Sequence, residues 1–352
     1  MPGQTNTLQV QDIPEPQAGV GEAVVRVLQA GLCGTDVEIT AGLFGEAPPG
    51  CGYLVLGHEN LGCVETAPAG AALSPGDLVV ATVRRPCPEE SCLPCRSGQN
   101  DMCLTGRYRE RGIQALHGFM SARYCEDPGN LVRVPPHLRG VGVLVEPMTV
   151  AQKGLEQAFR IQQRLSWRPR QAVVLGAGPI GILAAAALRI RGLDVTVASR
   201  EPQGSTRESL LREAGIAYAS TATTTVEELP RRLGTIDIVF EATGATPLIA
   251  GAMSLLGPNG VCILAGVTEV GHRVPVDLGG WNRQMVLGNR LVFGVVNAGR
   301  RHFEAAVRDL EVAEERLPGW LRRLITRRLP AGDAARAVVR EPGDIKTVLE
   351  FE

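Results

Sequence analysis

The stretch AVVLGAGPIG, Ala172–Gly181, decides the fold of the second half of the chain. Its apolar run predicts a buried strand, and Gly176, Gly178 and Gly181 then follow with the spacing G-x-G-x-x-G. The first glycine permits a tight turn, the second lets the backbone approach a pyrophosphate, and the third lets the next helix close on the strand. The free N–H groups of that helix would face the phosphates. The stretch therefore predicts a dinucleotide site, with a glycine-rich turn that binds no ligand as the alternative.

A regular alternation of strands and helices continues from this loop. Further strands are expected at Asp194–Ala198, Ile236–Phe240, Val261–Ala265 and Leu291–Gly294, with helical segments between them and a turn at Gly257–Gly260. Alternation at this spacing is typical of a doubly wound parallel sheet.

The end of the second strand indicates which nicotinamide cofactor is bound. A carboxylate there would accept hydrogen bonds from the ribose, but none occurs before Glu201. Ser199 can donate to a phosphate oxygen, and Arg200 can pair with it or stack on adenine. NADP is therefore favoured over NAD. In the alternative interpretation Arg200 is a solvated loop residue and Glu201 binds the ribose.

The first part of the chain consists of short apolar runs separated by glycine and proline. Ala23–Leu28, Tyr53–Leu56, Leu78–Ala81 and Leu131–Val134 are expected to be strands. A helix is expected at Thr149–Arg160. A β-rich domain of this kind places its functional residues on the loops between strands.

Potential metal ligands lie at these junctions. His58 and Glu59 follow one predicted strand, Cys33 precedes a Gly-Thr-Asp segment, and Glu146 comes much later. One thiolate, one imidazole and one or two carboxylates suit Zn²⁺ and leave a position open for substrate. Taken alone, His58 would instead be read as a hydrogen-bonded core histidine.

Four further cysteines, Cys87, Cys92, Cys95 and Cys103, have the spacing C-x4-C-x2-C-x7-C. Four thiolates give a closed tetrahedral zinc site without an open position, so the predicted role is structural. Clustering of cysteines in a large chain favours metal over disulfides. Scattered free cysteines are the alternative.

Length and composition limit the remaining options. A chain of 352 residues exceeds the size of a single growing core, so two domains are expected. The net charge of −1 gives no reason to expect nucleic acid or an acidic membrane surface as partner. No apolar run approaches the ~20 residues of a membrane span. The polar first residues lack a signal pattern, so a cytoplasmic location is expected.

Together these motifs and Glu146-Pro147 resemble the zinc-containing medium-chain dehydrogenase/reductase superfamily over nearly the whole chain. Within it, the chain is most similar to the archaeal-type glucose 1-dehydrogenases. The segments that carry this closer resemblance are Leu56–Glu59, Val83–Pro86, Glu110–Ile113, His117–Met120, Glu241–Gly244 and Val296–Asn297.

The resemblance implies a GroES-like β-rich catalytic domain and a Rossmann domain. The catalytic domain would comprise residues 1–150 and 297–352, with a structural zinc lobe at about residues 84–104. The Rossmann domain would comprise residues 151–296. A homo-oligomer, either a dimer or a tetramer, is also expected.

The implied activity is oxidation of the C1 hydroxyl of an aldose, glucose or possibly galactose, to the lactone. The enzyme would be an NAD(P)-dependent aldose 1-dehydrogenase with one catalytic and one structural zinc ion per chain. A zinc-dependent polyol or secondary-alcohol dehydrogenase on the same fold is one alternative. A non-catalytic NADP-binding protein that keeps zinc only for structure is another.

The resemblance also assigns residues to roles. Cys33, His58 and Glu146 would bind the catalytic zinc, and Glu59 would be either a direct ligand or one that exchanges with water or substrate. Thr35 would pass on the substrate proton. The residues expected to contact the sugar are Thr35, Glu110, Glu146 and Asn297. The residues expected to contact the cofactor are Gly176, Gly178, Pro179, Ile180, Gly181, Ser199, Arg200, Thr243, Gly244, Val267, Val296 and Asn297.

The chain departs from the family pattern in two places. The first cysteine gap is longer than in the usual C-x2-C-x2-C-x7-C. Val83 and Val150 are apolar where some members use polar sugar contacts, so the exact sugar stays open.

Overall fold

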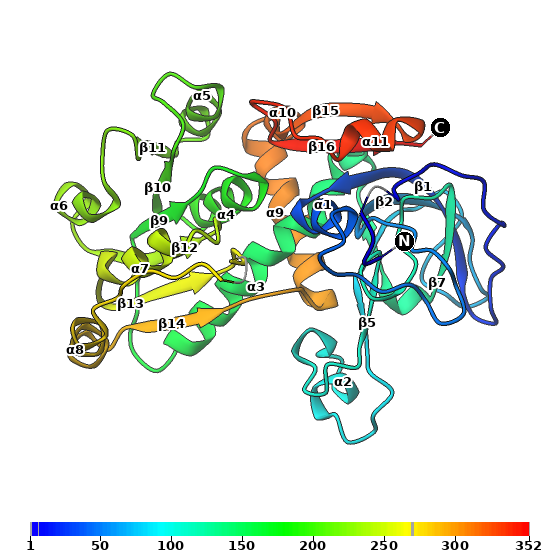
Figure 1. The fold of residues 1–352 in the computed structure, drawn as a ribbon, viewed down its shortest axis with the longest axis horizontal. Helices are drawn as coiled ribbons and strands as arrows, with labels where there is room; N and C mark the ends of the chain where they lie inside the picture. Colours follow the sequence, from blue (N-terminus) through cyan, green and yellow to red (C-terminus); the bar gives the residue numbers. More distant parts are fainter. Residues whose placement is uncertain (1, 6, 269–270, 352) are drawn as a thin grey trace. The chain divides into compact units, whose positions relative to one another are not determined.

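The computed structural model describes residues 2–5, 7–268 and 271–351 (Figure 1). The chain divides into two compact units. The first comprises residues 1–149, 297–314 and 318–352, and the second comprises residues 150–296 and 315–317. The first is rich in β-structure and the second contains a parallel sheet, so the predicted fold class is confirmed.

The first unit is built on a seven-stranded sheet in the order β15-β16-β1-β2-β3-β8, with β7 paired to β1. The apolar side chains that alternate along these strands form its core, which includes Val25, Val79, Phe119 and Tyr124. The strands are β1 (Ala23–Leu32), β2 (Glu59–Thr66), β3 (Leu78–Ala81), β7 (Arg123–Glu126), β8 (Leu131–Val134), β15 (Ile325–Pro330) and β16 (Lys346–Glu350).

A smaller sheet of β4 (Arg84–Arg85), β5 (Arg109–Arg111) and β6 (Ala115–Leu116) carries the cysteine-rich lobe. This lobe contains α2 (Leu93–Arg96) and the 3-10 turn η1 (Asn100–Met102), and it projects away from the seven-stranded sheet in Figure 1. The other helical segments that begin in the first unit are α1 (Gly34–Thr40), η2 (Pro128–Asn130), η3 (Pro136–Leu138), η4 (Gly142–Leu144), α3 (Val145–Gln162), α9 (Arg300–Arg316), α10 (Trp320–Leu324), η6 (Ala331–Asp333) and α11 (Ala334–Ala337).

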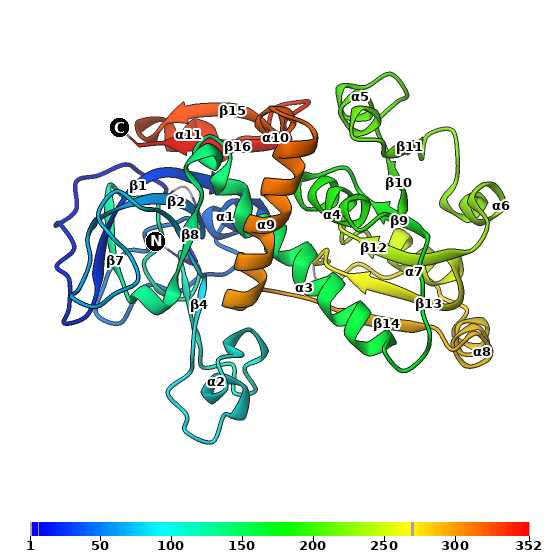
Figure 2. The ribbon, with the colours of Figure 1, turned by 180° about the vertical axis from the view of Figure 1, so that it is seen from behind.

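The second unit contains a six-stranded parallel sheet in the order β11-β10-β9-β12-β13-β14 (Figure 2). The strand order reverses between β9 and β12, which is where doubly wound sheets bind their ligands. Its strands are β9 (Gln171–Leu175), β10 (Asp194–Ser199), β11 (Ala217–Ser220), β12 (Ile236–Glu241), β13 (Leu256–Leu264) and β14 (Leu291–Gly294). Its helices are α4 (Pro179–Ile190), α5 (Thr206–Glu213), η5 (Val226–Glu228), α6 (Leu229–Leu233), α7 (Thr246–Leu255) and α8 (Leu278–Gly288).

The strand predicted at Tyr53–Leu56 is wrong, because this segment is a loop and β2 begins only at Glu59. The backbone here bonds to another loop, since Gly118 N donates to Val55 O (2.7 Å) and Met120 N donates to Leu56 O (2.9 Å). The apolar residues therefore pack without a strand ladder.

The turn predicted at Gly257–Gly260 is also wrong, because these residues lie within β13. The pairing between β12 and β13 is irregular here, since Ile236 faces Leu256 whereas Ile238 already faces Val261. Asn259 adopts a φ of 59°. The residues expected to form a turn therefore lie in an irregular part of the pairing between β12 and β13, where extra residues are inserted into β13.

Gly57, immediately before His58, offers a test of how tightly this loop is packed. It has a φ of 89°, and a Cβ there would lie 2.7 Å from Met120 Cγ. Gly57→Ala should therefore lower the midpoint of thermal unfolding through both backbone strain, about 1–2 kcal/mol, and steric overlap. Gly70→Ala is the matched control, because Gly70 has a φ of 81° with nothing near its Cβ position. Equal losses in the two variants would contradict tight packing at Gly57.

Candidate catalytic metal site and cofactor loop

Cys33 is held by the start of helix α1. It is the N-cap residue, its Sγ accepts from Thr35 N (3.2 Å), and its own N–H donates to Asp36 Oδ2 (3.0 Å). This reciprocal capping box fixes the direction of the thiol. The half-buried Thr35 is thereby placed beside Cys33, as the G-x-C-G-T-D motif requires.

His58 lies at the centre of the donor cluster. Its Nε2 is 2.9 Å from Cys33 Sγ, and its Nδ1 is 3.6 Å from Asp36 Oδ1. One side-chain donor atom from each of Cys33, Asp36 and His58 lies within 4.8 Å of the others, and the same holds for His58, Glu59 and Glu146. The structure thus brings together all four predicted ligands of the catalytic zinc around one imidazole.

The electrostatics of this cluster favour a cation. Burial alone would lower the pKa of His58, but the negative charges of Cys33, Asp36 and Glu146 raise it well above its usual value. Burial, reinforced by the charge of Glu59, raises the pKa of Glu146 to about 7. Buried anions crowded in this way are stabilised by a divalent metal, so the donor set fits zinc.

Asp36 was missed as a site residue in the sequence. It accepts a hydrogen bond from Gly57 N (3.2 Å) and lies behind the His58 ring. Carboxylates in this position orient metal-binding imidazoles. Its place three residues after Cys33, as in a capping box, is the signal that could have identified it.

Lys346 was also missed, because it lies on the last strand of the chain. This fully buried lysine forms an ion pair with Glu59 Oε2 and donates to Leu32 O (2.8 Å). A Cβ at Gly31 would overlap the Glu59 carboxylate, so glycine leaves the room that this pair occupies.

The four cysteines of the lobe converge as their spacing predicts. The Sγ atoms of Cys87, Cys92, Cys95 and Cys103 all lie within 4.8 Å of one another. Four thiolates around a tetrahedral zinc at ~2.3 Å would have a comparable separation. The donor set is complete without solvent and therefore fits a structural zinc.

Glu110 and Asn297 are neighbours although 187 positions separate them. Asn297 Nδ2 donates to Glu110 Oε1 (2.6 Å), and Arg84 Nε donates to the same oxygen (3.0 Å). The Arg84 guanidinium lies 3.6 Å from the centre of the Tyr108 ring. The buried carboxylate of Glu110 is thus neutralised by Arg84, a contact that the sequence analysis did not predict.

The glycine loop of the second unit fits a pyrophosphate. Gly176 has a φ of 106°, and a Cβ at Gly181 would overlap the carbonyl oxygen of Gly176. Gly178 caps α4 without a side-chain hydrogen bond, and its Cβ position points into open space. The first turn of α4, which contains Pro179 and Ile180, therefore presents backbone to this space.

A buried carboxylate organises the adjoining loop. Glu241 accepts hydrogen bonds from Thr243 N (2.7 Å) and Gly244 N (3.1 Å), and a Cβ at Gly244 would overlap Val267 O. Thr243, Gly244 and Val267, all predicted cofactor contacts, are thereby brought together. Val296, at the end of the second unit, accepts from Lys153 Nζ (3.0 Å).

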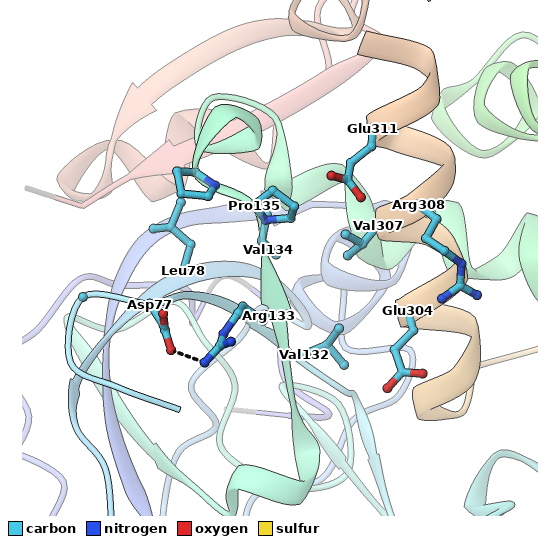
Figure 3. Close-up of a pocket in the computed structure, with 12 residues that line it drawn as sticks. Asp77, Leu78, Val132, Arg133, Val134, Pro135, Glu304, Val307, Arg308 and Glu311 are labelled. Atoms are coloured by element: carbon cyan, nitrogen blue, oxygen red, sulfur yellow. Dashed lines mark hydrogen bonds and ion pairs between the residues drawn. The ribbon is translucent and has the colours of Figure 1, made fainter. Parts of the chain in front are cut away.

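A separate pocket of about 360 Å³ lies in the first unit among β3, β8 and α9 (Figure 3). Asp77 and Arg133 form an ion pair of 2.7 Å on its wall, and Glu304 and Glu311 project from α9. None of its lining residues belongs to the predicted site.

Comparisons with known proteins agree with this arrangement. Residues 139–351 match the family model of the glucose dehydrogenase C-terminus, and residues 19–136 match the alcohol dehydrogenase GroES-like domain. A glucose 1-dehydrogenase of Methanocella arvoryzae is 43% identical, with 99% of this chain and 98% of that protein covered. One of Thermoproteus tenax is 40% identical, with 100% and 98% covered.

The chain is also similar to a solved structure of a glucose dehydrogenase. Haloferax mediterranei glucose dehydrogenase, in complex with NADP, Zn and gluconolactone, is 35% identical to this chain. The two structures superimpose with a TM-score of 0.89, covering 97% of this chain and 95% of the other.

The two metal sites should lose their ions separately. Purified protein is expected to contain two zinc ions per chain, measured by plasma mass spectrometry. His58→Asn should retain only the lobe ion, whereas Cys95→Ser should lose the lobe ion and unfold at a lower temperature, because the lobe depends on its metal. Two ions in both variants would contradict these assignments.

The buried Glu59–Lys346 pair should contribute measurably to the free energy of unfolding. Lys346→Met leaves a buried carboxylate without its cation and should reduce the free energy of unfolding by roughly 3–5 kcal/mol. The double variant with Glu59→Gln should recover most of this loss, because neither member of the pair is then charged. Urea unfolding measures both, and a double variant as unstable as Lys346→Met would argue against the pair.

Proposed function

The chain belongs to the glucose 1-dehydrogenase family of zinc-containing medium-chain dehydrogenases, and we propose that it oxidises the C1 hydroxyl of an aldose to the lactone with NADP. Glucose, or a close relative such as galactose, is the proposed substrate. The observation that carries this proposal is the approach of Cys33 and of Glu146 to the buried His58, in a chain 43% identical to a named glucose 1-dehydrogenase.

Cys33, His58 and Glu146 would hold the catalytic zinc, and the four lobe cysteines would hold the structural one. Bound zinc would polarise the C1 oxygen as a Lewis acid, and bound NADP would accept the hydride. The ion pair with Lys346 gives Glu59 a partner other than metal, which supports the exchanging role for this residue.

Thr35 would accept the proton of the C1 hydroxyl and pass it on. The capping box supports this role, because it places the Thr35 backbone against Cys33 Sγ and so holds the hydroxyl-bearing side chain near the metal ligands. Asp36 would keep the His58 ring in place during turnover.

Glu110 and Asn297 would recognise the sugar through its other hydroxyls. Their mutual hydrogen bond and the Arg84–Glu110 bond fix both groups before substrate arrives. Because Arg84 neutralises the carboxylate, the pair suits uncharged hydroxyls rather than a cationic sugar. A missing hydroxyl would leave buried polar groups unpaired, at a cost of ~1–3 kcal/mol.

A homo-oligomer is also proposed. Strand β14 forms one edge of the parallel sheet, and α8 exposes Leu278, Val286 and Leu287. An unpaired edge beside exposed apolar side chains is typical of an interface between copies of a chain.

The location of the protein is a separate question. Among the residues that the structure describes, no helix has both the length and the apolar character of a membrane span. None of the nine cysteines forms a disulfide, which suits the reducing cytoplasm, where we place the protein.

A substrate panel with both cofactors tests the proposal. Initial rates would be measured on glucose, galactose, xylose, sorbitol and simple alcohols, and the lactone identified by NMR. Turnover of glucose or galactose with NADP is the expected result. Activity confined to sorbitol or simple alcohols would establish the polyol or secondary-alcohol alternative instead.

Loss of the Glu110 carboxylate should weaken sugar recognition. Glu110→Gln is expected to reduce kcat/KM for glucose roughly tenfold to a hundredfold, mainly through KM, because an amide accepts fewer hydrogen bonds and loses Arg84. The matched control is Glu304→Gln, a half-exposed glutamate in the separate pocket, which should leave kcat/KM unchanged. A Glu110→Gln enzyme with unaltered KM would remove this residue from the sugar site.

A further inference from the structure

An ion pair lies just beyond strand β10, where doubly wound sheets distinguish NADP from NAD. Arg207 Nη1, from the first turn of α5, pairs with Glu201 Oε1. The two side chains are only 17% and 29% exposed. We propose that Arg207 sets the preference for NADP by holding the Glu201 carboxylate away from the adenosine ribose. This inference rests on the proposed function, since it assumes an NADP-linked dehydrogenase.

Glu201 is the residue whose charge would otherwise oppose the binding of NADP. It lies twenty positions beyond Gly181, where an acidic residue commonly accepts hydrogen bonds from the ribose hydroxyls. A free carboxylate there would repel a 2′-phosphate and select NAD. The pairing with Arg207 instead engages this carboxylate within the protein and cancels its charge.

The turn that carries both partners is fixed by hydrogen bonds. The Tyr218 hydroxyl donates to Glu201 O (2.8 Å), which fixes the backbone that bears the carboxylate. Gly204 N donates to Glu208 Oε2 (2.5 Å), and Glu208 N donates to Ser205 Oγ (3.2 Å). Glu208 is buried, so the start of α5 is anchored and Arg207 stays within reach of Glu201.

The charges around this ion pair explain why it should favour NADP over NAD. Arg200, Glu201 and Arg207 together carry a net charge of +1, which suits a phosphate. Half-buried Ser199 and exposed Arg200 then remain to contact it, as the sequence predicts. Without Arg207 the same three positions would carry no net charge, and Glu201 would be released toward the ribose.

The test uses the full-length, zinc-loaded protein and two nucleotide probes. 2′,5′-ADP carries the distinguishing phosphate and 5′-AMP lacks it, so the ratio of their dissociation constants by titration calorimetry reports phosphate recognition without turnover. Arg207→Met should weaken 2′,5′-ADP roughly tenfold without weakening 5′-AMP, because the released Glu201 can accept hydrogen bonds from the ribose hydroxyls. The ratio of kcat/KM for NADP over NAD should fall by a similar factor.

A double-mutant cycle separates this mechanism from a direct phosphate contact. Adding Glu201→Gln to Arg207→Met restores the net charge of +1 and should return 2′,5′-ADP affinity to near the wild-type value. Arg207→Lys should retain the preference. Arg212→Met is the matched control, because Arg212 lies on the same helix but pairs with Glu208 (2.7 Å), and it should change neither ratio.

Two results would overturn the inference. These are an unchanged probe ratio in Arg207→Met, whether or not both probes weaken together, or a double variant as weak toward 2′,5′-ADP as Arg207→Met. If the wild-type protein oxidises glucose with NADP while one of these holds, only the inference fails. If it binds neither probe and oxidises no sugar, the proposed function fails with it.

Discussion

Lys346, on the last strand of the chain, lies buried against Glu59, on the strand that follows His58. Removing two charges from water is costly, so the pair is favourable only when both strands are in place together. It sits among the donors of the candidate metal site, since Glu59 and Glu146 both approach His58. The geometry of this site therefore depends on β16 pairing with β1, and on the C-terminal segment as a whole.

Several of the buried acids are paired with arginine. Glu110 is held by Arg84, and Glu126 by Arg85 and Arg111. Burial would raise the pKa of Glu126, but the two arginines lower it. The cluster around His58 differs, because the charges of Cys33, Asp36 and Glu146 act together on one imidazole and raise its pKa. An excess of buried negative charge is the electrostatic property that separates a metal site from a structural ion pair.

The sequence was sufficient to predict the features that depend only on residues close together in the chain. The glycine loop, the alternation of strands and helices and the four clustered cysteines each require only neighbouring residues, and the structure contains all of them. The Lys346–Glu59 pair and the Arg84–Glu110 bond were not predicted, because no periodic pattern links residues so far apart. Tyr53–Leu56 shows the opposite limit. Its apolar run has the pattern of a strand, but its backbone hydrogen bonds are made with a loop. The partner of a backbone group is set by the tertiary structure, so the local sequence could not predict it.

The cysteine lobe has a consequence for how the protein is made. Asn100 Nδ2 donates to Arg84 O, and Arg84 Nη1 donates to Asp101 O (3.4 Å), so the lobe supports the strand that carries Arg84. All four of its thiols leave the ribosome long before Asn297 and Lys346 are synthesised. The four lobe thiols are therefore all present when less than a third of the chain has been made, whereas the lysine that pairs with Glu59 beside His58 is the seventh residue from the end. The two clusters thus become complete at opposite ends of synthesis.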